Sequence, residues 1–179
     1  MIRYAVAVIL AAALIAASMP AVESAATTRG ENAVASTVAE IEAAAEDLIE
    51  EERLPPKGIM GPQRSVELSF PRDSLTSAPI RNLELARVNG ENVTVARYRV
   101  KGGSVQTVVI DAPIVNESMG APVKLGRPTG EVTYVLTLQR EPNSDERPVV
   151  VLTRTSRRQS RCIRHDRRCP VPSLVVGSC

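Results

Sequence analysis

An apolar run near the amino terminus limits what this chain can be more than any other feature does. No charged residue occurs between Arg3 and Glu23, over residues 4–22 (YAVAVILAAALIAASMPAV). A helix rises about 1.5 Å per residue, so this run would be roughly 28 Å long, close to the bilayer's hydrocarbon thickness of about 30 Å. The sequence therefore predicts that residues 1–22 form a transmembrane anchor or a signal peptide. The lipid bilayer is then one expected partner, through residues 4–22.

Two interpretations of this run remain open. Arg3 gives a minimal charged region before the run, and two small-x-small patterns, 16–18 and 24–26, resemble signal-peptide cleavage sites. An uncleaved run with Arg3 before it favours an amino end inside the cell and a carboxyl-terminal domain outside. We expect a single-pass protein of the cell membrane with an extracytoplasmic domain. The alternative is a secreted, soluble, β-rich binding module whose signal peptide is cleaved near Ala26.

A second helix is predicted over residues 23–53, which are rich in alanine and glutamate. Apolar residues spaced alternately by four and three form a seam along one face, and the opposite face is acidic. The seam predicts either pairing of helices between subunits or packing of the helix on the outer domain. The residues that would carry the pairing are Val34, Val38, Ile41 and Leu48. Joined to the anchor, this helix would be a stalk that lifts the rest of the chain from the membrane.

A linker rich in proline and glycine, residues 54–64, ends the helix, because proline lacks an amide donor and clashes inside a helix. Beyond the linker the hydrophobic period changes to two, which predicts a β domain over residues 65–154. The predicted strands cover 65–70, 82–88, 93–100, 105–111, 131–139 and 149–153. Hairpin turns without helical crossovers favour an antiparallel β-sandwich or open barrel of about six or seven strands. The predicted fold class is mainly β with an amino-terminal α extension.

The sequence does not predict catalytic or cofactor chemistry. The one histidine, His165, and all three cysteines lie beyond residue 161, so the β domain lacks these nucleophiles and metal ligands. No glycine-rich nucleotide loop, H-E-x-x-H motif or EF-hand loop occurs. Aromatic residues make up 2% of the chain, too few for a platform on which bases stack, so nucleic-acid binding is not expected. We expect a non-enzymatic protein without cofactor or metal.

Residues 155–179 form a tail of different composition. From residue 153 onward seven arginines accompany one acidic residue, and neither a helical nor a strand period persists. We predict a disordered tail. Cys162 and Cys169 would form a disulfide if the tail is extracellular, or remain free thiols. The C-x2-H-x3-C spacing around His165 is not that of common zinc sites.

Two N-glycosylation sequons lie in or beside predicted turns of the outer domain. They are Asn92-Val93-Thr94 and Asn116-Glu117-Ser118. If the domain is exported, Asn92 and Asn116 are the expected glycosylation sites.

Five motifs give the chain a resemblance to a known family. They are MIRYAVAVIL at the amino terminus, EERLPPKG at the linker, DSLTSAP (73–79), IDAPIVN (110–116) and RPVVVLTR (147–154). Over residues 1–154 the chain resembles a family of small, uncharacterised haloarchaeal proteins. The resemblance implies a membrane-anchored protein of unknown function, with a layout similar to type IV pilin-like subunits. The resemblance carries over no functional residues. Protein partners or self-association are expected from the seam of the stalk helix.

Overall fold

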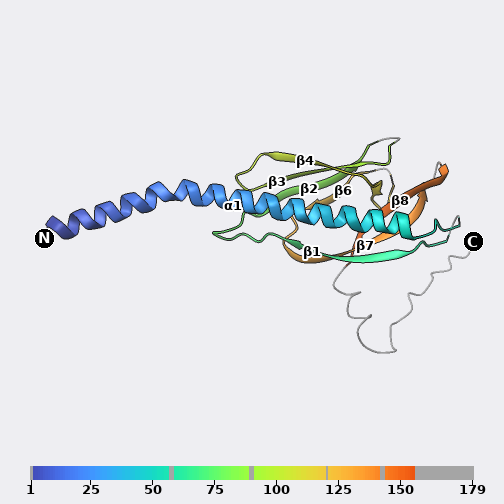
Figure 1. Ribbon diagram of the computed structural model, residues 1–179, viewed down its shortest axis with the longest axis horizontal. Helices are drawn as coiled ribbons and strands as arrows, with labels where there is room; N and C mark the ends of the chain where they lie inside the picture. Colours follow the sequence, from blue (N-terminus) through green and yellow to red (C-terminus); the bar gives the residue numbers. More distant parts are fainter. Residues whose placement is uncertain (1, 57–58, 89–90, 120, 142–143, 156–179) are drawn as a thin grey trace, which may run out of the picture.

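The computed structural model describes residues 2–56, 59–88, 91–119, 121–141 and 144–155. A long helix, α1 (Ile2–Glu51), precedes two four-stranded sheets (Figure 1). The first sheet has the order β1 (Gln63–Phe70), β7 (Gly130–Glu141), β8 (Ser144–Arg154), β5 (Ile114–Val115). The second has the order β4 (Val105–Ile110), β3 (Thr94–Val100), β2 (Ile80–Arg87), β6 (Val123–Gly126). The prediction of a mainly β fold with an amino-terminal helical extension is confirmed.

One continuous helix takes the place of the two segments predicted for residues 1–22 and 23–53. Pro20 lies inside α1 without ending it, and the helix ends at Glu51, shortly before Pro55 and Pro56, where helical geometry is excluded. Figure 1 shows the amino-terminal half of α1 projecting from the domain, while its carboxyl-terminal half runs along the sheets. The two halves of this helix therefore have different surroundings.

The carboxyl-terminal half of α1 contacts strands of both sheets: β1, β7 and β8 of the first, and β3 and β4 of the second. The four seam residues proposed for helix pairing, Val34, Val38, Ile41 and Leu48, are at most 1% exposed and belong to the main hydrophobic core. The seam therefore packs on the chain's own β domain, the alternative to pairing that the sequence left open. Pairing through these residues would require the helix to leave the domain.

The core between the sheets is built from alternating side chains, as the period of two predicts. Leu68 and Phe70 of β1 and Leu136 and Leu138 of β7 are all at most 2% exposed. The rings of Phe70 and Tyr134 meet edge to face, with centroids 6.5 Å apart. Because aromatic residues are so few, the rest of this core consists of aliphatic side chains that must interlock closely.

The structure departs from the predicted strands in three places. Residues 141–148, which lie between the predicted strands 131–139 and 149–153, belong largely to a long β7–β8 hairpin in which Arg140 pairs with Pro148 and Glu141 with Ser144. Strands β5 and β6 were not predicted, because two and four residues are too short to show a period. Strand β5 pairs with β8 in parallel, so the first sheet is mixed rather than purely antiparallel.

Polar contacts join the layers at several points. Arg87 of β2 forms an ion pair with Glu141 of β7, with 2.7 Å between Nη1 and Oε1, and so links the two sheets. The hydrogen bond that Arg87 donates lowers the pKa of Glu141 below its ordinary value. At the end of α1, Arg64 of β1 reaches Asp47 at 2.7 Å and Glu51 at 2.8 Å. These contacts fix the helix end and the sheets in one arrangement.

Candidate functional site

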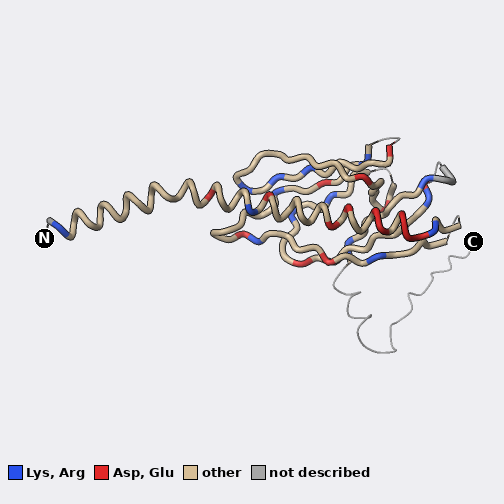
Figure 2. The backbone as a smooth tube through the Cα atoms, viewed as in Figure 1, with Lys and Arg blue, Asp and Glu red and all other residues tan. Residues whose placement is uncertain are grey.

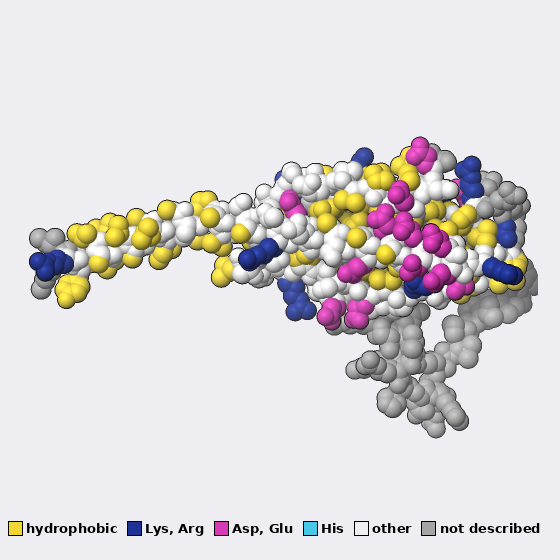
Figure 3. All heavy atoms as spheres, in the orientation of Figure 1, with side chains coloured by type: hydrophobic (Ala, Val, Ile, Leu, Met, Phe, Trp, Pro, Cys, Tyr) yellow, Lys and Arg dark blue, Asp and Glu magenta, His cyan; other side chains and the backbone are white. Residues whose placement is uncertain are grey.

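The most unusual surface of the molecule is the projecting half of α1. Every described side chain from Arg3 to Ala25 is exposed, and hydrophobic side chains cover this segment in Figure 3. The large hydrophobic side chains here range from 47% exposed at Val22 to 81% at Tyr4. Among the described residues, α1 is the one helix that is long and apolar enough to cross a membrane. Continuous apolar surface of this kind marks an interaction site with lipid or protein.

The domain begins where the apolar run ends. Ala26 is the first buried residue of α1, and its carbonyl oxygen accepts a hydrogen bond from the Ala78 amide at 3.0 Å. Only four positions, about 6 Å of helix, separate Val22 from Ala26. From Ala26 on, the segment predicted as a stalk (23–53) is thus part of the domain.

Gly30 makes this close contact possible. A Cβ built on Gly30 would lie 2.6 Å from the Ala78 carbonyl oxygen, well inside van der Waals contact. Gly30 lies within α1 and admits the backbone of the 71–79 connection. An isolated glycine in a helical pattern can signal such packing, but its partner could not be identified from the sequence.

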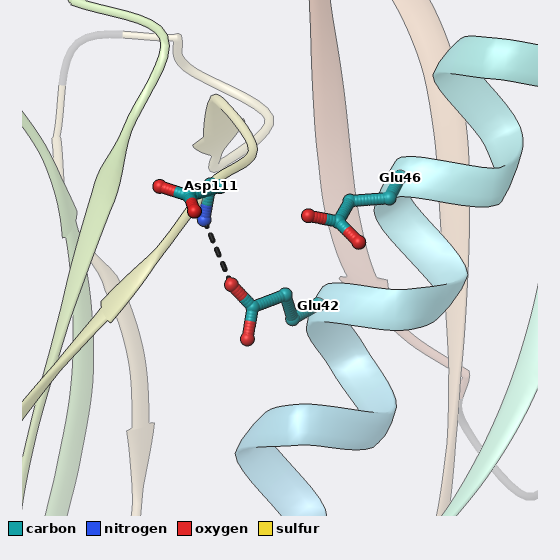
Figure 4. A group of neighbouring side chains, drawn as sticks. All are labelled: Glu42, Glu46 and Asp111. Atoms are coloured by element: carbon teal, nitrogen blue, oxygen red, sulfur yellow. Dashed lines mark hydrogen bonds between the residues drawn. The ribbon is translucent and has the colours of Figure 1, made fainter.

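Three carboxylates come together where α1 passes the end of β4 (Figure 4). Glu42 and Glu46 lie one turn apart on α1, and one oxygen from each and one from Asp111 lie within 4.8 Å of one another. The Asp111 amide donates a hydrogen bond to Oε1 of Glu42 at 2.9 Å. Oxygen ligands of this kind suit Ca²⁺ or Mg²⁺, but all three residues are partly or fully exposed, so solvent screens their repulsion. We assign no metal here.

This cluster belongs to a wider acidic face. Figure 2 shows acidic residues gathered along the carboxyl-terminal half of α1, and each of them is partly or fully exposed. The i, i+4 pair Glu42 and Glu46 was visible in the sequence as part of the acidic face. Its neighbour Asp111, 69 positions from Glu42, became apparent only in three dimensions.

The two sequons have different environments. Asn92 is exposed in the β2–β3 connection, whereas Asn116, directly after β5, is half-buried. The Oδ1 atom of Asn116 is buried and has no hydrogen-bond partner among the described residues. Thr94 of the first sequon is fully buried; its hydroxyl donates to the Ala112 carbonyl at 2.7 Å and accepts from the Ile114 amide at 2.8 Å. Asn92 is thus the more exposed of the two sequon asparagines.

Cys162 and Cys169, the predicted disulfide pair, lie outside the described residues. Two hollows flank Arg154 at the end of β8, of about 500 Å³ and 530 Å³. The first is lined by Tyr134 and Leu125, among others, and the second by Thr137 and Val151 on the outer face of the first sheet. Neither hollow has a histidine or cysteine among its described lining residues. The expectation of no catalytic residue stays a prediction.

Comparison with known protein families gives a match. The model of a family described as "Domain of unknown function (DUF7311)" matches residues 1–155, which is close to the range, 1–154, that the sequence motifs indicate. The matched region includes α1 and all eight described strands. No curated protein and no solved structure matches the chain.

Proposed function

The chain belongs to the DUF7311 family of domains of unknown function, and we propose that it is a non-enzymatic, single-pass, membrane-anchored protein with an extracytoplasmic β domain. Its role would be that of a structural or interaction component of a cell envelope or a type IV pilus-like assembly. The single observation that carries the proposal is the division of α1 into an exposed apolar half and a half buried in the domain.

The exposed half needs an apolar environment. Burial of a Val, Leu, Ile or Met side chain is worth about 1.5–3 kcal/mol, and many such side chains project from this segment without cover from the domain. They are Val6, Val8, Ile9, Leu10, Leu14, Ile15, Met19 and Val22. A helix also satisfies its own backbone hydrogen bonds, as a membrane-spanning segment must. The bilayer supplies the missing environment.

The helix geometry favours an uncleaved anchor over a cleaved signal peptide. Cleavage at the 24–26 pattern would cut α1 at the residue whose carbonyl holds the Ala78 amide. In the folded chain, peptidase access would require the helix to unwind at its junction with the domain. The secreted, soluble module therefore remains the second candidate.

Self-association, if it occurs, would use the exposed half of α1, because the seam at Val34, Val38, Ile41 and Leu48 is already covered. A helix that projects at one end and packs on a β domain at the other is also the layout implied by the resemblance to haloarchaeal, pilin-like proteins. Expected partners are thus the bilayer and other copies of the chain. Both kinds of partner would contact the chain through residues 4–22.

Alkaline carbonate extraction of membranes tests the anchor. The intact chain should stay in the membrane pellet, whereas Leu10→Arg/Leu14→Arg should be released, since each arginine at the centre of a helix costs about 2.5–3.5 kcal/mol of insertion. The matched control Ser36→Arg places the charge on an exposed site of the packed half and should stay in the pellet. Release of the unaltered chain would contradict the proposal.

A further inference from the structure

The described hydrophobic side chain most exposed to solvent does not lie on the apolar run. It is Leu75, 87% exposed, in the connection between β1 and β2. Neighbouring residues hold it in place: the Ser74 amide donates to the Ser77 carbonyl at 3.1 Å, and the Ser77 amide donates to the Ser74 carbonyl at 3.4 Å. These reciprocal bonds close a tight turn, residues 74–77, with Leu75 and Thr76 at its tip. A leucine that a fixed turn presents to solvent gains free energy when an apolar environment covers it.

The turn is attached to the helix at the level where the apolar run ends. Ala78, directly after the turn, donates its amide to Ala26 and packs against Gly30. Leu75 lies three positions before Ala78, a reach of at most about 10 Å, and Val22 lies about 6 Å along the axis from Ala26. Figure 1 shows the connection after β1 extending beside α1 toward its amino-terminal end. Leu75 can thus reach the level at which the apolar run of α1 ends.

The neighbouring turn adds a second apolar side chain at this end of the domain. Gly102 and Gly103 join β3 to β4 beside Thr27 of α1, and Val105, the first residue of β4, is 61% exposed. The Lys101 amide donates to the Pro79 carbonyl at 2.9 Å, so the two turns are joined. Leu75 and Val105 therefore belong to one face, which we call the membrane-proximal face: residues 23–31, 71–79, 99–105 and 127–131.

Charge on this face is nearly balanced. Its basic residues are Arg29, Arg72, Arg99, Lys101 and Arg127, and its acidic residues are Glu23, Glu31, Asp73 and Glu131. Lys101 and Asp73 lie 3.6 Å apart as an exposed ion pair. Strong attraction to anionic lipid is therefore not expected, and contact with a bilayer would depend on the apolar side chains.

We propose that the turn 74–77 is a second point of contact with the bilayer, at which Leu75 enters the interfacial zone beside the helix. This inference rests on the proposed anchor and adds the orientation of the domain. The membrane-proximal face lies against the headgroups, and the strands stand with their ends toward the membrane. The helix and the turn together hold the domain upright, as two attachment points restrict tilt more than one does.

The absence of tryptophan from the chain allows a direct test. Three full-length variants, each with one tryptophan, are reconstituted in phosphatidylcholine vesicles containing lipids brominated near the headgroup or deep in the chains. Leu14→Trp reports on the apolar run, and Leu75→Trp reports on the turn. Ile59→Trp is the matched control, because Ile59 is 62% exposed at the opposite end of the domain.

We expect deep bromine atoms to quench Leu14→Trp and shallow ones to quench Leu75→Trp, whose emission is blue-shifted relative to that of Ile59→Trp. Quenching of Leu14→Trp with Leu75→Trp emitting like the control would overturn the second contact and leave the anchor standing. Equal quenching of Leu75→Trp and Ile59→Trp would also overturn it, because the domain would then lie flat. An unquenched Leu14→Trp would overturn the anchor itself.

Discussion

Gly30 of α1 lies against the carbonyl oxygen of Ala78 so closely that a Cβ at position 30 would be 2.6 Å from it. This contact joins the helix to the connection between β1 and β2, where the projecting and packed halves of α1 meet.

Replacement of Gly30 by alanine should therefore lower the stability of the domain. In an unhindered helix the change would stabilise by about 0.8–1 kcal/mol, but the clash involves backbone, and overpacking typically costs about 1–3 kcal/mol. We expect a net loss in urea denaturation of the detergent-solubilised chain. Ser36→Ala, at an exposed site of the same helix, should be neutral or slightly stabilising. A Gly30→Ala chain at least as stable as the parent would contradict the tight contact.

Truncation of Ile41 should destabilise the domain, because its side chain is fully buried. Ile41→Ala is expected to cost about 2–5 kcal/mol of unfolding free energy, with Glu40→Ala, at an exposed neighbouring position, as the matched control. If the seam instead paired helices between subunits, the variant would change the oligomeric state and leave the unfolding of the domain unaffected. Size-exclusion chromatography with light scattering, run beside the denaturation, distinguishes the two results.

The Arg87–Glu141 pair predicts a specific dependence of stability on pH. Because the pKa of Glu141 is lowered in the folded chain by its bond to Arg87, the folded state binds fewer protons than the unfolded state in this range. The stabilisation is complete above the ordinary glutamate pKa of about 4.3 and is lost as pH falls through the lower folded value. The difference in unfolding free energy between parent and Glu141→Gln should thus be large at pH 7 and shrink in acid.

Glu67, exposed on β1, provides the control for this experiment. The parent and Glu67→Gln should differ little at either pH. A parent-to-Glu141→Gln difference that stays constant from pH 7 into the acid range would show that the ion pair is not the source of the effect.

Glycosylation should distinguish the two sequons. In a host that modifies exported proteins, Asn92→Gln should remove the glycan mass, whereas Asn116→Gln should leave it unchanged, because Asn92 is exposed and Asn116 is half-buried. Mass spectrometry of glycopeptides from both variants checks this. A glycan on Asn116 would contradict this prediction, because it would show that this segment is accessible when the glycan is added.

The sequence predicted those parts of the fold that depend on local patterns. The uncharged run, the prolines after the helix and the alternation of Leu68 with polar neighbours each indicate a single local structure. The seam of Val34 and Ile41 predicted a buried face, but periodicity cannot tell whether a seam packs on its own domain or on another subunit. The packing found here follows from the helix lying against both sheets.

The features that could not be predicted depend on contacts between distant segments. Strand β5 has two residues, and its parallel pairing with β8 is set by the fold around it. The approach of Gly30 to Ala78 and of Glu42 to Asp111 joins positions that nothing in the sequence relates. In the sequence Leu75 is one apolar residue between polar neighbours, and the role proposed for it depends on where the helix leaves the domain.

The central claim is that α1 remains whole and holds the domain to a membrane. The most direct measurement is the intact mass of the protein isolated separately from membranes and from culture medium. The account predicts a membrane-bound species of 19.2 kDa, apart from any glycan, that retains residues 4–22. A species found in the medium that lacks the residues before about Ala26 would contradict it.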